Sequence, residues 1–188
     1  MPINTIAVLH ARRSIRQFNG REVSRGEIET LLDAAVAAPN HRLTQPWRFY
    51  VLGAQARRAY GLALGNRKAK KIEDAAAADV VRNKVADEHA ALPLMIIVAV
   101  AEDANPEIRE EDVSASMMAI QNLSIAAVAL GLGTHIKTGA VMQDPAARAA
   151  AGVPDGVRIV AVLNVGEPTS IPPAKERKSA ASLTTWLP

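Results

Sequence analysis

The amino-acid sequence predicts an α+β fold in which helices wrap a small mixed sheet. Three observations support this prediction: short apolar runs typical of buried strands, longer segments with helical periodicity, and their order. The order is helix, helix, strand, helix, helix, strand, long helix, strand, helix, strand, which lacks the alternation of a doubly wound fold. Because 188 residues without a linker or an internal repeat fit one core, we expect one domain over residues 1–188.

The N-terminal part of the chain is predicted to contain two helices. Apolar side chains at helical spacing indicate a short helix over residues 3–11. Ser24 and Glu27 form a capping box, and the apolar face that follows them continues to residue 38. This second helix stops before Pro39, because a proline disfavours the helical conformation of the residue that precedes it.

The middle of the chain is predicted to contain two strands, each followed by helix. Residues 48–53 indicate a buried strand and residues 54–64 a short helix. Residues 65–89 are rich in lysine, alanine and aspartate, which predicts an exposed helix with a mobile lead-in, either a lid or an ordinary surface helix. Residues 92–101 indicate a central strand covered on both faces. Residues 108–130 form the longest predicted helix, apolar most of the way round and therefore expected to face a second subunit in part.

The C-terminal part is predicted to add two strands and an extended tail. The strands cover residues 134–138 and residues 157–166. Between them, an Asp-Pro pair starts a short helix over residues 144–152. The tail, residues 167–188, contains four prolines and a basic group. An ordered tail of this kind must lie on a surface, either its own or a partner's.

The composition narrows the possible functional classes. The chain has no cysteine, which excludes disulfides, thiol nucleophiles and thiolate-bound metal centres. The formal charge of +3 favours a phosphate partner, while an aromatic content of 3% provides no stacking platform for nucleic acid. The start lacks a signal-peptide layout, and no apolar run is long enough for a membrane span. We therefore expect a soluble cytoplasmic protein with no membrane or nucleic-acid partner.

The sequence lacks the usual catalytic constellations. Four histidines are scattered without metal-ligand spacing, so no metal site is expected: His10, His41, His89 and His135. No G-x-S-x-G nucleophile elbow occurs. The acidic residues 110–112 are interpreted as complementing the dipole at a helix start. Gly131 and Gly133 close a helix, whereas a dinucleotide-binding loop follows a strand. An enzyme with this inventory depends on a cofactor for its reactivity.

Two segments stand out for their polar side chains. Residues 12–18, R-R-S-I-R-Q-F, combine three guanidinium groups with a hydroxyl, which indicates either an anion site or a solvated turn at a helix C-terminus. Residues 38–47, A-P-N-H-R-L-T-Q-P-W, hold polar and aromatic groups between a helix and a strand. That pattern is typical of a loop presented to a ligand, or of a connector whose Trp47 anchors the strand in the core.

Both segments resemble motifs of the nitroreductase family of flavin enzymes. Residues 12–18 are similar to the family's opening signature, and Q-P-W-R-F at residues 45–49 stands at the expected distance behind a capped helix. Three further segments continue the resemblance in family order: G-L-G at 131–133, K-T-G at 137–139 and V-G-E-P at 165–168. The tail at residues 175–186 resembles the family's basic closing segment. The resemblance covers nearly the whole chain, whose length is similar to that of the compact, short-chain branch.

The resemblance implies a nitroreductase-like fold with a mainly antiparallel sheet, assembled as an intertwined homodimer. It implies FMN bound at the subunit interface, with NADH or NADPH as the reductant. A nitroaromatic, a quinone or a similar small-molecule acceptor then reoxidises the flavin in a ping-pong mechanism. No catalytic protein residue is implied, because the flavin carries the chemistry.

The resemblance also implies which residues bind the cofactor. Arg12, Arg13 and Ser14 are expected to hold the phosphate and the ribityl chain. Arg16 is expected to place positive charge near the N1–O2 edge of the flavin. A further phosphate contact is expected from Arg177.

His41 and Gln45 are expected to reach the flavin that is bound mainly by the other subunit. The residues between them, 42–44, are expected to set substrate preference. Contacts through backbone or side chain are expected from Ile136, Lys137 and Thr138.

One departure from the family pattern leaves the substrate open. Many members carry serines and an asparagine shortly before Gln-Pro-Trp, where this chain has P-N-H-R at residues 39–42. A first alternative is an FMN enzyme of other chemistry: dehalogenation, enone reduction or flavin breakdown. A second alternative is a basic phosphate- or nucleic-acid-binding module without redox activity. A third is an FMN storage or regulatory protein.

Overall fold

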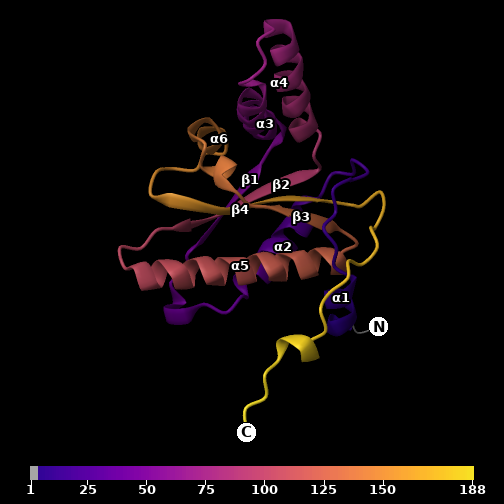
Figure 1. Cartoon of the computed structure of the whole chain (residues 1–188), viewed down its shortest axis with the longest axis vertical. Coiled ribbons are helices and arrows are strands. Elements are labelled where there is room, and N and C mark those ends of the chain that lie inside the picture. Colours follow the sequence, from indigo (N-terminus) through magenta and orange to yellow (C-terminus); the bar gives the residue numbers. More distant parts are fainter. Residues whose placement is uncertain (1–3) are drawn as a thin grey trace.

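The computed structural model describes residues 4–188 and has a four-stranded sheet between two layers of helices (Figure 1). The strands are β1 (Trp47–Leu52), β2 (Leu94–Ala101), β3 (Gly133–Lys137) and β4 (Val157–Gly166), in the spatial order β1-β2-β4-β3. Every adjacent pair is antiparallel. Within residues 4–188, the one parallel pairing is the isolated bridge between Ser14 and Thr134. The α+β class and the mainly antiparallel sheet are thereby confirmed.

The two central strands owe their place to side chains that are apolar on both faces. All of β2 except its last residue is buried, as the unbroken apolar run predicts. In β4, burial is continuous from Ile159 onward. At the edge of the sheet, Trp47 begins β1 and packs into the core with 9% of its surface exposed. The prediction that Trp47 anchors this strand is confirmed.

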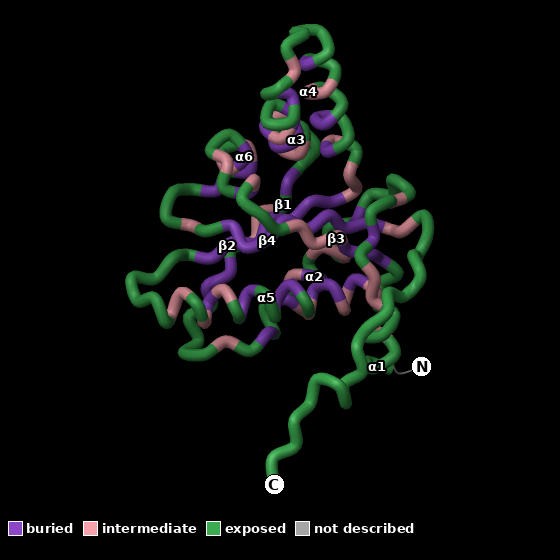
Figure 2. Tube along the Cα trace, viewed as in Figure 1, coloured by how far each residue is buried: buried purple, intermediate pink, exposed green. Residues whose placement is uncertain are grey.

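Helices cover both faces of the sheet. α2 (Arg25–Val36) and α5 (Pro106–Ala129) lie on one face, and α3 (Ala54–Ala69) and α6 (Pro145–Ala150) lie on the other (Figure 1). The core against α2 and α5 includes Leu31, Ile96, Val98, Leu123 and Leu163. The core against α3 and α6 includes Leu52, Tyr60, Met95, Ile97 and Val162. Figure 2 shows that burial is concentrated in the sheet and in the helix faces turned toward it.

The remaining short elements lie at the periphery. α1 (Thr5–Ala11) lies beside the C-terminal end of α5 and buries none of its residues (Figure 1). The predicted start of this helix at residue 3 lies outside the described residues. Three 3-10 turns cover His41–Leu43, Ala140–Gln143 and Ala181–Leu183.

α3 and α4 (Ala75–Ala90) form a helical hairpin whose helix boundaries differ from those predicted from the sequence. The prediction that the helix from residue 54 ends at residue 64 is wrong, because α3 continues to Ala69. A Cβ on Gly65 would lie 2.8 Å from the Arg82 Cα, so this glycine permits close helix packing and does not break α3. α4 is therefore not an exposed helix on all sides, and its buried residues are Ala78, Val85, Ala86 and His89.

The tail runs from the end of β4 past α1 and away from the helical layers (Figure 1). Its residues 169–188 are exposed throughout (Figure 2). Across residues 4–188, no helix combines the length and the apolar character needed to cross a membrane.

Candidate cofactor site

A groove of about 790 Å³ lies between the end of α1, residues 12–17 and the tail. Five cationic side chains and no carboxylate line this cation-lined groove: Arg12, Arg13, Arg16, Lys175 and Arg177. The hydroxyl-bearing Ser14 lines it as well. The fold thus brings Arg177 to the predicted arginines at the other end of the sequence. Such a surface favours an anion, because guanidinium and ammonium groups make charge-assisted hydrogen bonds to phosphate or carboxylate oxygens.

Ile15 fixes the N-terminal wall of the groove. α1 ends at Ala11 with Arg12 as its C-cap, after which Ile15 turns inward and is 3% exposed. The Ile15 N–H donates to the Thr134 carbonyl at 2.9 Å. A Cβ on Gly133 would lie 2.3 Å from the Ile15 Cγ1, so this close contact requires glycine at position 133. Ile15 thereby attaches the arginine segment to the start of β3.

The Arg13 side chain bonds carbonyl groups at the end of α1, while the neighbouring Arg12 and Arg16 have no ion-pair partner among the described residues. Arg13 Nη1 donates to the carbonyls of His10 and Arg12, at 2.7 and 2.9 Å. Its Nε is buried and has no partner among the described residues. Within residues 4–188, no carboxylate lies at ion-pair distance from Arg12, Arg13 or Arg16. Both interpretations of residues 12–18, helix terminus and anion site, therefore describe part of the segment.

β3 presents its free edge beside this segment. The Thr134 carbonyl accepts from Ile15 and so points away from β4. Strand alternation then directs the N–H and C=O of Ile136 toward the same free edge. The Ile136 side chain packs against the core on the α2–α5 face. A ligand at this edge would therefore meet the backbone of Ile136 and not its side chain.

His135 and Lys137 alternate with Ile136 and lie on the opposite face of β3. Burial lowers the pKa of the Lys137 amine, and the nearby Lys68 lowers it further. Burial also lowers the pKa of His135, to which Lys137 and Arg16 contribute by charge repulsion. These groups concentrate positive charge along β3, and a bound anion would relieve the repulsion.

Three of these basic residues were not predicted from the sequence to be site residues: Lys68, His135 and Lys175. Signals for two of them were present, because Lys175 belongs to the basic group of the tail and Lys68 to a lysine cluster. Neither signal says which distant segment the side chain will face. His135 had no signal beyond its place in a predicted strand.

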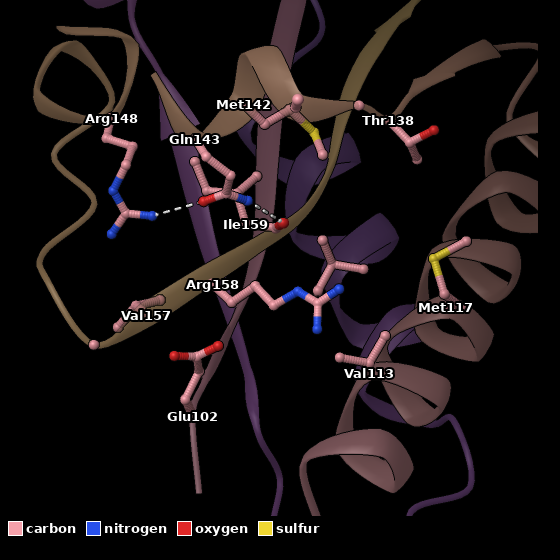
Figure 3. Close-up of a pocket in the computed structure, with 14 residues that line it drawn as sticks. Glu102, Val113, Met117, Thr138, Met142, Gln143, Arg148, Val157, Arg158 and Ile159 are labelled. Atoms are coloured by element: carbon pink, nitrogen blue, oxygen red, sulfur yellow. Dashed lines mark hydrogen bonds between the residues drawn. The ribbon is translucent and has the colours of Figure 1, made fainter. Parts of the chain in front are cut away.

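Thr138 lines a second cavity, of about 680 Å³, beyond the end of β3 (Figure 3). α5 contributes Val113 and Met117 to this cavity, and the first half of β4 forms another wall. The side chain of Arg158 points into the cavity toward Val113 and Met117 (Figure 3). The structure therefore places Thr138 outside the cation-lined groove, although it follows Lys137 directly.

His41 and Gln45 lie far from the cation-lined groove in the same chain. Their loop lies against the N-terminal part of α5, where His41 Nδ1 is 3.0 Å from Glu111 Oε1. α1, whose C-terminal end lines the groove, lies near the other end of that helix (Figure 1). Between Glu111 and Ala129, α5 spans about 27 Å at 1.5 Å per residue. One chain therefore brings together the arginines and Arg177, but not His41 and Gln45.

The interpretation of residues 110–112 as complementing a helix start is wrong. The N-cap of α5 is Asn105, whose side chain accepts from the Glu107 N–H. Asp112 lies further along the helix, is 4% exposed, and accepts a hydrogen bond from Thr44 Oγ1 at 2.5 Å. Thr44 and Asp112 are 68 positions apart, and no local sequence pattern predicts such a contact.

Comparison with known proteins identifies the family. A sequence profile described as Nitroreductase family matches residues 9–167. "Putative NAD(P)H nitroreductase YfhC" from Bacillus subtilis is 31% identical over 170 residues, which cover 90% of this chain and 87% of that protein. "Putative NAD(P)H nitroreductase YdjA" from Escherichia coli is 28% identical over 166 residues, which cover 88% of this chain and 89% of that protein.

Solved structures agree with the sequence comparison. The nitroreductase-like family protein from Bacillus cereus has a TM-score of 0.86 and 27% identity, with coverage of 100% of this chain and 97% of that chain. A "putative nitroreductase in complex with fmn" from Desulfovibrio desulfuricans has a TM-score of 0.74 and 24% identity, with coverage of 100% and 99%. The resemblance seen in the sequence is confirmed, and the chain belongs to the nitroreductase family.

Proposed function

We propose that this protein is an FMN-dependent oxidoreductase that takes reducing equivalents from NADH or NADPH. It delivers them, in a second half-reaction, to a nitroaromatic, a quinone or a similar acceptor. The observation that carries the proposal is the groove lined by five cations and no carboxylate, at the position of the family's opening signature. The names of the Bacillus subtilis and Escherichia coli relatives, and the FMN in the Desulfovibrio desulfuricans structure, support it.

The groove fits the phosphate of FMN. Arg12, Arg16 and Arg177 offer guanidinium groups without internal ion pairs, and such groups match phosphate oxygens well. The buried Nε of Arg13 has no hydrogen-bond partner in the described part of the chain, and a ligand oxygen would satisfy it. The exposed hydroxyl of Ser14 provides a neutral donor for the phosphate or the ribityl chain.

The edge of β3 fits the polar rim of a flavin ring. Ile136 offers its backbone N–H and C=O, and Lys137 offers an ammonium group with no ion pair among the described residues. Arg16 adds positive charge close to the neighbouring His135. When bound, FMN supplies a group that both accepts and donates hydride. The chain then has to place and charge the cofactor, and no protein acid or base is required at the reacting atom.

The proposed enzyme is a homodimer, because one chain separates the two parts of the site. A two-fold partner could bring the loop of His41 and Gln45 to the groove, since a two-fold axis perpendicular to α5 pairs opposite ends of its two copies. Apolar side chains left uncovered support a partner: Met117 and Met118 on α5 are 41% and 42% exposed, and Trp186 and Leu187 in the tail are 88% and 87% exposed.

Anaerobic reduction tests the proposal. Purified protein incubated with FMN is expected to retain it through gel filtration, to lose its yellow colour on addition of NADH or NADPH, and to regain it with a nitroaromatic or a quinone. A protein that stays colourless would contradict FMN binding. A yellow protein that neither nucleotide bleaches would contradict the oxidoreductase and favour a storage role. Profiling of halogenated and enone acceptors then separates nitroreduction from the other flavin chemistries.

The homodimer, the single domain over residues 1–188 and the cytoplasmic location stay predictions. The electron acceptor and the cofactor contacts of individual residues stay predictions as well. Light scattering of the FMN-loaded protein tests the homodimer, because an FMN-loaded monomer would contradict a shared site.

A further inference from the structure

We propose that Asp112 and Glu111 of α5 are positioning residues, which hold the loop of residues 40–45 in the shape that meets the cofactor. The inference rests on the proposed function, because it concerns the same shared site. It adds two residues that do not line the cation-lined groove and that act through the loop.

A chain of hydrogen bonds connects Asp112 to the far side of the loop. The Gln45 N–H donates to Asn40 Oδ1 at 2.6 Å. The Asn40 Nδ2 donates to Thr44 Oγ1 at 3.0 Å. The Thr44 hydroxyl then donates to Asp112 Oδ1 at 2.5 Å, and Asp112 is buried. The Thr44 hydroxyl therefore links the Asp112 carboxylate to Asn40, the residue that precedes the turn. Through Asn40, the carboxylate is also linked to the backbone N–H of Gln45.

The loop needs this support because its backbone is strained. Arg42, Leu43 and Gln45 have φ values of 60°, 49° and 44°. They are the only non-glycine residues with positive φ within residues 4–188. Side chains with a Cβ rarely adopt this left-handed region, and strain of this kind persists only where surrounding contacts impose it. In the absence of the hydrogen bond from Thr44 to Asp112, the loop is expected to relax toward ordinary backbone conformations.

Glu111 contacts the side chains of His41 and Arg42 in the loop. Its Oε1 lies 3.0 Å from His41 Nδ1, and its Oε2 lies 3.8 Å from Arg42 Nε. Arg42 Nη2 also donates a hydrogen bond to Glu107 Oε1 at 3.4 Å. With Arg42 turned toward α5, the loop presents the Leu43 side chain, which is 77% exposed. Beside the polar His41 and Gln45, the loop thus offers one apolar side chain to a flavin, while Arg42 is directed toward the carboxylates of α5.

A variant set tests this inference. Thr44→Val keeps the shape of the side chain but removes the hydroxyl that connects Asn40 to Asp112. Thr44→Ser retains the hydroxyl and is the rescue variant. Glu110→Gln is the matched control, because it removes a carboxylate next to Glu111 that has no ion pair among the described residues.

Two measurements are made on each protein. The first is the rate of trypsin cleavage at the Arg42–Leu43 bond without FMN, and the second is the Kd for FMN. For Thr44→Val, we expect about 10-fold faster cleavage and about 10-fold weaker FMN binding, the effect of one lost hydrogen bond to a charged group. The melting temperature should fall little. Thr44→Ser and Glu110→Gln should stay within about 2-fold of the wild type in both measurements.

The outcomes separate this inference from the proposed function. If the wild type binds FMN and Thr44→Val binds it equally well, the positioning role is wrong while the proposed function stands. Faster cleavage with unchanged FMN affinity also overturns the inference, because the hydrogen bonds would then serve only local stability. If the wild type binds no FMN, the proposed function fails, and the trypsin rates still report whether Asp112 holds the loop.

Discussion

The cation-lined groove and the loop of residues 40–45 lie near opposite ends of α5 and satisfy their polar groups in opposite ways. In the groove, five cations face one another without a carboxylate. In the loop, Asp112 and Glu111 bind Thr44, His41 and Arg42 from within the chain. Charged side chains without partners indicate a place that receives a ligand. A strained loop whose polar groups are bonded within the chain indicates a conformation that is held ready to contact a partner.

This difference predicts that the groove governs the affinity for FMN more strongly than the loop does. Arg12→Ala is expected to weaken FMN binding by about 1.5–3 kcal/mol, about 10- to 100-fold in Kd, because a charge-assisted contact to phosphate is lost. Titration of FMN by fluorescence measures the change. Arg25→Ala is the control, since Arg25 is an exposed arginine paired with Glu29 on α2. An equal Kd for wild type and Arg12→Ala would remove Arg12 from the site.

A change at Gly133 is expected to disturb the groove without altering any of its charges. The added Cβ of Gly133→Ala would force Ile15 away from β3, and overpacking of this kind costs about 1–2 kcal/mol of unfolding free energy. FMN binding should weaken as well, because the arginine segment follows Ile15. Denaturant unfolding and FMN titration measure both effects. Gly26→Ala, where a Cβ meets nothing within 4 Å, should leave both unchanged or slightly raise stability. A stable Gly133→Ala would refute the proposed anchoring role of Ile15.

Acid pH is expected to produce the smallest effect, and at the groove end of the molecule. Burial lowers the pKa of His89 below its ordinary value of 6.5, with further lowering by Lys137 and Lys68 and an opposing contribution from the Val85 carbonyl. The unfolded chain then binds a proton more readily than the folded chain, so stability is present above pH 6.5 and falls as the pH drops below it. His135 contributes in the same direction.

Melting temperatures of the protein without FMN, measured between about pH 8 and 5, test this expectation. His89→Leu should show a shallower decline below pH 6.5 than the wild type, because one of the two histidines with a lowered pKa is gone. Parallel curves would show that His89 does not cause the decline.

Local patterns in the sequence predicted most of the fold. The apolar run of β2, the capping box at Ser24 and the Asp-Pro start of α6 each act within a few residues, so they can be seen without a structure. Gly65 shows the limit of prediction from local sequence patterns. A glycine inside a helix is a break or a contact depending on a neighbour, and the neighbour here is α4.

The motifs of the candidate site could be predicted from the sequence, but the contacts between its distant segments could not. Residues 12–18 were recognised by composition and by family resemblance, and the structure brings the predicted Arg177 to the same groove and adds Lys175. The hydrogen bond between Asp112 and Thr44 could not be predicted, because its partners lie on separate elements. The strain at Arg42 and Leu43 was equally invisible, since neither is a residue that favours positive φ.

Subunit complementation tests the shared site most directly. One chain carries Arg12→Ala with Arg16→Ala, the other carries His41→Ala with Gln45→Ala, and differently tagged copies are co-expressed to isolate the mixed dimer. If the groove of one chain and the loop of its partner form one site, the mixed dimer has one intact site and should bind about half as much FMN as the wild type. Each parental dimer should bind FMN poorly. A mixed dimer that binds no more FMN than either parent would place groove and loop in the same chain and contradict the shared site.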